Sequence, residues 1–252
     1  MLIMRQEQMH ALREVAASNF EAALVERGRQ FAPRLAALRG VQAMQRLVVA
    51  AVGHARVHGF DRRGPVRFWV EMSLAHGLRW FDDPQLEPVN RHLAEREPDQ
   101  LARAERVHAA LLAHVARADG EARVLARQAL AELLALDWKT LLAPQPDPAA
   151  TAIAVMQVVH PHRARLLGQA TLNRVAIAAG AACRELGIEV QRGQVLLAGL
   201  MIGFGHGVLE DPMYPWVRST LADGTAPAAR RCEALARKTR RYARAVLDHW
   251  TS

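Results

Sequence analysis

The feature that most constrains this chain is an internal duplication. A shift of 128 positions takes Gly77 to Gly205 and the Asp83-Pro84 corner to residues 211–212. The match extends upstream without a gap, where it pairs Pro33 with Pro161, Gly40 with Gly168, and Gly59 with Gly187. Self-similarity at one fixed period indicates that one structural unit is used twice. We therefore expect two tandem copies of a multi-helix unit, related by pseudo-twofold symmetry.

Composition favours helices in both copies. Hydrophobic residues make up 51% of the 252 residues and aromatic residues only 5%, so alanine and leucine carry the apolar content. Apolar residues three and four positions apart predict helices over 5–30, 41–58, 84–95, 121–136, 191–205 and 227–250, with others starting at Pro65 and Pro98 and one ending at Gly187. No stretch has the pattern of a strand. The expected fold class is all-α.

The duplication also divides the chain into segments. Residues 1–118 form a first helical repeat unit, residues 119–150 a connecting helix with a proline-rich linker, and residues 151–252 a second repeat unit. The helix at 121–136 has no counterpart in the second half. Residues 137–151 read as a linker because Pro144, Pro146 and Pro148 interrupt them.

Cysteine content and hydropathy bound the compartment. Cys183 and Cys232 are too few for a disulfide framework, and their spacing fits no zinc motif. No run approaches the ~18 uninterrupted apolar residues of a membrane span. The opening residues 1–4 are followed at once by charges, unlike a signal peptide. We expect a cytoplasmic protein with no membrane partner.

The net charge of +8 raises the question of a nucleic-acid partner. Only Lys139 and Lys238 are lysines, and the arginines alternate with acidic residues at helical spacing, as on a solvated helix face. A basic face on the final helix could still contact phosphates, but few aromatic residues stand near it for base stacking. A nucleic-acid-binding module is therefore only the third interpretation.

Asp83 and Asp211 recur at the same position in both copies, each directly before a proline. Paired carboxylates could hold a cation or act in acid-base catalysis. An aspartate followed by proline is also the pattern of a helix N-cap, which is worth ~1 kcal/mol. Proline fits capping and contributes nothing to catalysis, so we interpret both residues as structural caps.

Histidines provide the alternative of a His-dependent enzyme or a metal-binding protein. His54 and His58 lie one helical turn apart, and His206 stands between two glycines. His76 pairs with Phe204 under the shift, which favours a packed core ring. No acidic neighbour completes a metal site beside the histidine pair, and no known catalytic motif is present. We therefore expect no metal, no cofactor and no enzymatic activity.

The second corner carries more apolar and aromatic surface than a capping turn requires. Met213, Tyr214 and Trp216 stand there, and tyrosine and tryptophan are enriched at interface hot spots. Basic residues follow on the final helix. We predict a partner-binding surface made of Met213, Tyr214, Trp216, Arg237 and Arg241. The alternative is that Tyr214 and Trp216 fill the core between the two units.

Three short motifs of the first copy form a recognisable series. They are MRQEQMHAL at residues 4–12, the turn His58-Gly59-Phe60, and the corner at residues 81–84 (FDDP). In this order they resemble a group of poorly characterised helical bacterial proteins encoded beside type VI secretion spike and effector genes. The likeness covers residues 1–115 and, in the second half, the part from the turn onward.

In that group the corner is followed by Pro-Trp, which only the second copy keeps, as Pro215-Trp216; the first copy has Pro88-Val89. If these residues form a recognition surface, the second copy carries it. The resemblance implies a non-enzymatic adaptor or chaperone-like accessory protein, or an immunity protein. Its partner would be a secretion effector, a toxin or a spike component.

Overall fold

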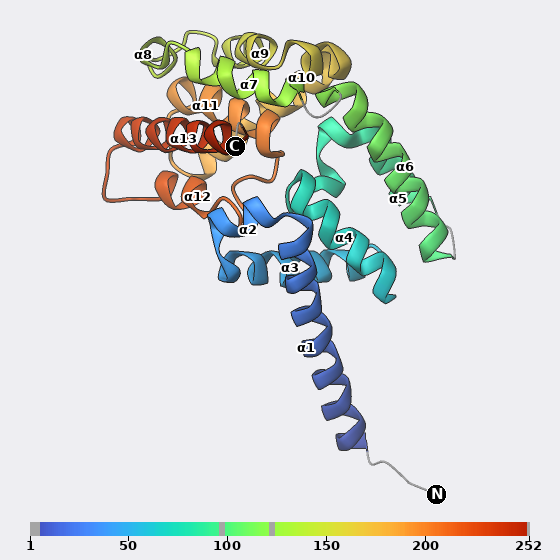
Figure 1. Cartoon of the computed structure of the whole chain (residues 1–252). Coiled ribbons are helices and arrows are strands. Elements are labelled where there is room, and N and C mark those ends of the chain that lie inside the picture. Colours follow the sequence, from blue (N-terminus) through green and yellow to red (C-terminus); the bar gives the residue numbers. More distant parts are fainter. Residues whose placement is uncertain (1–5, 96–98, 121–123, 251–252) are drawn as a thin grey trace, which may run out of the picture.

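The computed structural model describes residues 6–95, 99–120 and 124–250, and every regular element within them is helical (Figure 1). The all-α prediction is confirmed for these residues. The first half contains α1 (Gln6–Phe31), α2 (Pro33–Arg39), α3 (Val41–Val57), α4 (Arg63–His76), the 3-10 helices η1 (Trp80–Asp82) and η2 (Pro84–Leu86), α5 (Glu87–Ala94) and α6 (Gln100–Asp119). Then follow α7 (Val124–Ala135), α8 (Trp138–Leu141), α9 (Pro148–Val159), α10 (Pro161–Glu185), α11 (Val190–Phe204), α12 (Pro215–Leu221) and α13 (Ala228–Trp250).

The expected linker is more ordered than its prolines indicated. Residues 137–151 contain α8 and the start of α9, because Asp147 Oδ1 accepts the N–H of Ala150 at 2.9 Å and Pro148 suits the first turn of a helix. Met4 and Arg5 of the first motif, and the expected helix start at Pro98, lie outside the described residues. The helix that follows, α6, begins at Gln100 with Asp99 as its N-cap.

Under the shift of 128 positions, α2 and α3 together correspond to α10, α4 to α11, α5 to α12 and α6 to α13, whereas η1 and η2 correspond to turns. A glycine with φ 79° and ψ 166°, Gly40, separates α2 from α3, and α10 bends at Gly168 with φ 73° and ψ 164°. Glycine adopts positive φ at low energetic cost, so a glycine at these two positions favours both bends.

Two arginines brace equivalent turns. Arg103 Nη2 donates to the carbonyl oxygen of Gly59 at 3.2 Å, and Arg231 Nη2 donates to that of Gly187 at 2.8 Å. Each arginine also reaches the carbonyl of the preceding residue. These are the same contact at positions 128 residues apart.

Buried apolar side chains form two clusters, one in each half. The first includes Met44, Trp69 and Trp80, and the second includes Met156 and Leu197. The connecting helix α7 joins the second cluster through Ala129 and Leu133, which are 2% and 7% exposed. In Figure 1 the first half lies below the second, and α6 runs along one side of the molecule.

The N-terminal part of α1 projects from the body (Figure 1). Met9, Leu12 and Val15 are 39%, 55% and 58% exposed along it. Among the described residues, no single helix is both long and apolar enough to cross a membrane; α2 and α3 reach that length and composition only together, and they are bent by 113°.

Candidate functional site

The two halves meet where the corner after α4 crosses the corner after α11. Each corner is a glycine with positive φ, 91° at Gly77 and 92° at Gly205. A Cβ on Gly77 would lie 3.0 Å from the carbonyl oxygen of Phe204, and a Cβ on Gly205 would lie 2.8 Å from that of His76. Only glycine permits so close a backbone approach in this conformation. The recurring glycines therefore mark the contact between the halves.

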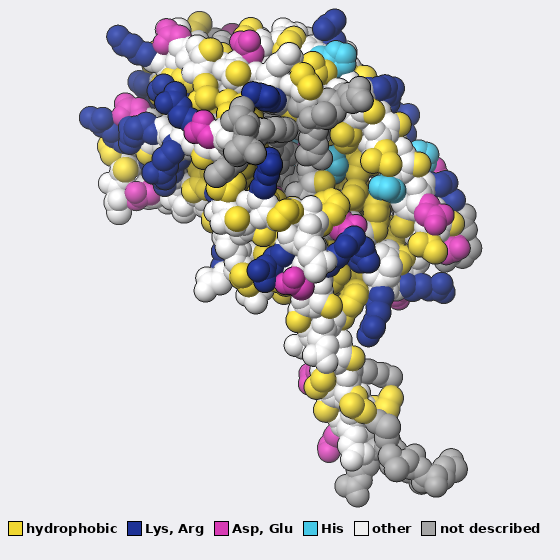
Figure 2. Space-filling model, viewed as in Figure 1, with side chains coloured by type: hydrophobic (Ala, Val, Ile, Leu, Met, Phe, Trp, Pro, Cys, Tyr) yellow, Lys and Arg dark blue, Asp and Glu magenta, His cyan; other side chains and the backbone are white. Residues whose placement is uncertain are grey.

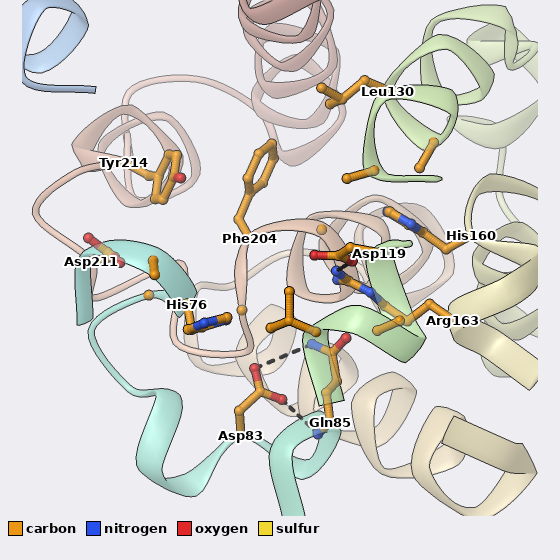
Figure 3. Close-up of a pocket in the computed structure, with 18 of the residues that line it drawn as sticks. His76, Asp83, Gln85, Asp119, Leu130, His160, Arg163, Phe204, Asp211 and Tyr214 are labelled. Carbon is orange, nitrogen blue, oxygen red and sulfur yellow. Dashed lines mark hydrogen bonds and ion pairs between the residues drawn. The ribbon is translucent and has the colours of Figure 1, made fainter. Parts of the chain in front are cut away.

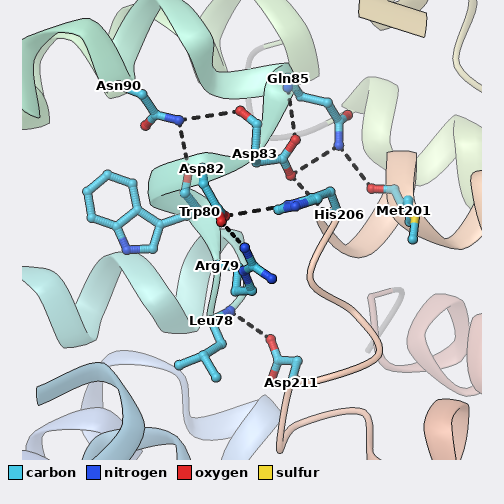
Figure 4. A network of polar contacts seen from close by, with 10 residues as sticks. All are labelled: Leu78, Arg79, Trp80, Asp82, Asp83, Gln85, Asn90, Met201, His206 and Asp211. Atoms are coloured by element: carbon cyan, nitrogen blue, oxygen red, sulfur yellow. Dashed lines mark hydrogen bonds and ion pairs between the residues drawn. The ribbon is translucent and has the colours of Figure 1, made fainter. Parts of the chain in front are cut away.

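Asp83 and Asp211 tie these corners together by exchanging hydrogen bonds (Figure 4). Asp83 Oδ2 accepts the backbone N–H of His206 at 2.9 Å, and Asp211 Oδ2 accepts that of Leu78 at 2.9 Å. Leu78 and His206 are also 128 positions apart. Each carboxylate therefore holds the backbone of the opposite half.

The second oxygen of each carboxylate binds locally. Asp83 Oδ1 accepts the N–H of Gln85 at 2.8 Å and is the N-cap of η2. Asp211 was expected to cap a helix in the same way, and this is wrong: its Oδ1 accepts the N–H of Met213 at 2.8 Å in a turn, and α12 begins only at Pro215. Asp83 and Asp211 are 3% and 2% exposed, and burial raises the pKa of both carboxyls.

A wider polar network fixes the first corner against α11 (Figure 4). Asp82 forms an ion pair with Arg79, and its other oxygen lies 3.7 Å from His206 Nδ1. Gln85 Nε2 donates to the carbonyl oxygen of Met201 at 2.9 Å. Through these contacts, His206 and Met201 of the second half are held against the first corner.

The histidine pair of the alternative interpretation packs among aromatic rings. His58 Nδ1 lies 2.9 Å from the carbonyl oxygen of His54, one turn earlier on α3. The His58 ring centroid is 4.6 Å from that of Phe81 and 4.9 Å from that of Trp69. Burial lowers the pKa of His54. Across 6–95, 99–120 and 124–250, no group of three or more His, Cys, Asp or Glu side chains is placed to hold a metal ion.

A cavity of about 260 Å³ opens beside the crossing corners (Figure 3). Helices of the first half, α7, and helices of the second half all contribute to its wall. It is somewhat smaller than typical small-molecule sites, which measure roughly 300–1,000 Å³. Apolar side chains supply much of the lining, among them Leu35, Leu74, Leu86, Val115, Leu130 and Phe204.

Polar groups on the cavity wall largely neutralise one another. Arg163 forms an ion pair with Asp119, which joins the start of α10 to the end of α6, and its Nη1 donates to the carbonyl oxygen of Ile202 at 2.6 Å. Burial lowers the pKa of His160 to about 3, and it also lowers the pKa of His114. Neutral rings and a closed ion pair suit an apolar occupant better than a highly charged one.

The predicted partner-binding residues fall in different environments. Met213 is 1% exposed and packs in the first core, so including it in a docking surface is wrong. The turn at Asp211 directs the Met213 side chain across the contact between the halves. Tyr214 and Trp216 are half-buried, and Tyr214 packs against both cores. Arg237 and Arg241 are exposed on α13.

Trp216 borders a shallow hollow of about 310 Å³. We call it the aromatic-basic hollow, and it is lined by Arg39, Trp216, Lys238, Arg241, Tyr242 and Ala245. The Arg39 guanidinium carbon lies 4.4 Å from the Tyr242 ring centroid, and the Trp216 ring lies 6.0 Å from the same ring. Three of the six lining residues are cationic and none of these six is acidic, so the hollow attracts negative charge.

Basic side chains are spread widely over α13 (Figure 2), but several are committed to structural contacts. Arg231 braces the turn at Gly187, and Arg230 pairs with Glu233 at 3.0 Å. Arg237 does not line the aromatic-basic hollow, whereas Arg241 does. Exposed cations therefore stand on α13 both at the hollow, as Arg241, and outside it, as Arg237, Arg240 and Arg244.

Sequence reasoning missed Arg39 and the cavity. Arg39 is an isolated arginine before Gly40, and nothing in the sequence connects it with α13. Compared with known proteins, the chain matches no family model, no curated protein and no solved structure.

Proposed function

We propose that this chain is a non-enzymatic, protein-binding accessory protein built from two copies of one helical unit related by a pseudo-twofold axis. Three kinds of contact support the duplication: the crossing glycine corners, the exchanged aspartate bonds and the braced turns. A twofold axis through the crossing corners would exchange the two members of each kind. Two units joined in this way leave shared faces on which a partner can dock.

The observation that carries the binding proposal is the aromatic-basic hollow. A half-buried indole, Trp216, stands beside Arg39, Lys238 and Arg241 on its rim. Tryptophan and arginine are the side chains most enriched at interface hot spots. Complementary charge favours a partner segment that is acidic and carries an apolar side chain for the indole.

The secretion setting of the proposal rests on the motifs of the first copy. Residues 4–12 and the corner at residues 81–84 resemble proteins encoded beside type VI secretion genes. In that setting the partner is a secretion effector, a toxin or a spike component, and the chain works in the cytoplasm as an adaptor or chaperone. An immunity protein is the variant in which the partner is a toxin to be blocked.

Structural commitments of the polar groups also favour binding over catalysis. The carboxylates of Asp83 and Asp211 accept backbone N–H groups on both oxygens. His58 packs against Phe81 and Trp69. These structural contacts account for the positions of the side chains without a substrate.

Replacement of Trp216 by alanine tests the proposal. A hot-spot tryptophan is worth roughly 2 kcal/mol or more, so partner recovery in a pull-down from host cells should fall about 30-fold. The matched control is Trp138→Ala on α8, another half-buried tryptophan, which packs beside Leu133. Trp138→Ala should keep the partner, and circular dichroism checks that both variants fold.

If a folded Trp216→Ala variant still recovers the partner, the partner does not dock at the aromatic-basic hollow. If that variant does not fold, charge reversal at the exposed Arg241 tests the proposal instead. Arg241→Glu should lose the partner, whereas Arg240→Glu, exposed on the same helix outside the hollow, should retain it.

A further inference from the structure

The cavity of about 260 Å³ lies where the two copies of the duplicated sequence meet. Under the shift of 128 positions, both members of several residue pairs line it, among them the two corner glycines and the pair of Leu86 with Tyr214. Other pairs have diverged in polarity: Arg163 on the cavity wall corresponds to Leu35, which also lines the cavity. The wall therefore combines a polar end with an apolar remainder.

Two histidines and an ion pair form the polar end. His160 stands beside Asp119 and Arg163 (Figure 3), and His114, on the same helix as Asp119, lines the same cavity. Burial, and after it the charge of Arg163, lowers the pKa of both histidines, so both rings are neutral at pH 7. Both terminal nitrogens of Arg163 are already bound, one to Asp119 and the other to the carbonyl oxygen of Ile202. This end therefore suits a neutral hydrogen-bonding group better than a charged one.

His114 gives the most direct sign of a ligand. It is 6% exposed, and within the part of the chain that the structure describes its ring has no hydrogen-bond partner. Buried polar side chains in proteins are nearly always hydrogen-bonded, and an unpaired one calls for an explanation. A hydroxyl or N–H group of a bound molecule would supply the missing partner.

Helix α11 leaves space in the wall next to this end. A Cβ on Gly203, which lines the cavity, would meet only His160 Nε2, at 4.0 Å. Gly199, one turn earlier, also lines the cavity, and a Cβ there would meet nothing within 4 Å. Alanine would fit at both positions and would favour the helix. Packing within the chain therefore does not account for the two glycines, whereas space for a ligand does.

We propose that this cavity binds a small uncharged molecule that has an apolar body and one hydroxyl or N–H group. The polar group hydrogen-bonds to the His114 ring, and the apolar body lies against Phe204 and Leu130, which face the same cavity (Figure 3). A cavity of about 150 Å³ is known to bind benzene, so a body of about two fused rings fits here. The site is separate from protein docking at the aromatic-basic hollow, and only Tyr242 lines both.

The probe is 2-naphthol, and naphthalene, which lacks the hydroxyl group, is its matched control. Equilibrium dialysis with the full chain should show one 2-naphthol bound per chain, about fivefold more tightly than naphthalene, because the difference is one hydrogen bond. His114→Leu keeps a side chain of similar size and removes the hydrogen-bonding ring. It should weaken 2-naphthol binding to the level of naphthalene and leave naphthalene binding unchanged.

Gly203→Leu tests the location of the site. The added side chain takes up space beside His160, so binding of both probes should weaken by about tenfold or more. The matched control is Gly53→Leu, at another helical glycine whose added Cβ meets nothing within 4 Å, on α3 and outside the cavity lining. This variant should bind both probes unchanged. Circular dichroism checks that all variants fold.

Absence of saturable 2-naphthol binding up to about 1 mM, the weak end of specific association, would overturn the proposal. Unchanged binding in a folded Gly203→Leu variant would also overturn it, because the probe would then bind elsewhere. Equal affinity for the two probes, or an equal loss of both in His114→Leu, would overturn the hydrogen bond to His114, and this comparison decides alone if Gly203→Leu does not fold. None of the substituted residues lines the aromatic-basic hollow, so failure here is distinguishable from failure of the Trp216 test.

Discussion

Removal of the Asp211 carboxylate should destabilise the protein more than the loss of a cap. Asp211→Ala takes the acceptor from the N–H groups of Leu78 and Met213 at a site that is 2% exposed, where water cannot easily replace it. Each unsatisfied buried donor costs roughly 1–3 kcal/mol. Relief of a buried carboxylate, whose pKa is raised by burial, offsets part of this. We expect the free energy of unfolding to fall by about 2–4 kcal/mol, against ~1 kcal/mol for a helix cap.

Asp83→Ala removes the reciprocal bond to His206, and the two losses should not be independent. Both carboxylates stabilise the same contact between Gly77 and Gly205. Once one of them is removed this contact is already weakened, so removal of the other costs less. The double variant should therefore lose less than the sum of the single losses. Coupling between residues in contact is typically about 0.5–3 kcal/mol.

Chemical denaturation followed by far-UV circular dichroism measures all three variants. The matched control is Asp137→Ala, which also removes the acceptor of two backbone N–H groups, those of Lys139 and Thr140, but at an exposed site where water takes over. An Asp211→Ala loss no larger than that of Asp137→Ala would refute the argument from buried donors. Strictly additive losses would refute the shared contact.

Two further predictions concern His160 on the cavity wall and the glycine at the second corner. Burial lowers the pKa of His160 from 6.5 to about 3, so its contribution to stability is complete above pH 6.5 and is lost as the pH falls toward 3, by up to about 1.4 kcal/mol per pH unit. His160→Gln should flatten this acid limb in denaturation curves, although Asp83 and Asp211, with raised pKa values, act in the opposite direction. Gly205→Ala should lower the melting temperature much more than Gly168→Ala, because both have positive φ but only Gly205 faces a backbone oxygen 2.8 Å from the added Cβ. Equal shifts would contradict the close approach.

The two corners could be recognised from the sequence, but their contact with each other and its hydrogen bonds could not. Recurring glycines and aspartates drew attention to the corners, because each corner needs a glycine with positive φ. From the capping pattern, Asp83 and Asp211 were expected to accept hydrogen bonds only from N–H groups close in sequence. Their second acceptor bonds reach Leu78 and His206 across 133 and 123 positions. No local pattern encodes a partner at that distance.

The residues of the proposed docking surface were only partly predictable for the same reason. The aromatic run of the second corner drew attention to Trp216, but polarity alone could not distinguish the buried Met213 from its half-buried neighbours. Arg39 comes from the other half, and its side chain reaches Tyr242 at the hollow only in the folded chain. The cavity is assembled from helices of both halves and leaves no single-segment signal.

The central claim, that a partner docks at the aromatic-basic hollow, is tested most directly by photocrosslinking in host cells. A photoreactive residue replaces Ala245, which lines the hollow, or Ala109, which is exposed on α6 far from it. The account predicts that crosslinks from position 245 map to an acidic segment of a partner protein, that Arg241→Glu abolishes them, and that position 109 gives none. No crosslink from position 245, or the same crosslinks from both positions, would contradict it.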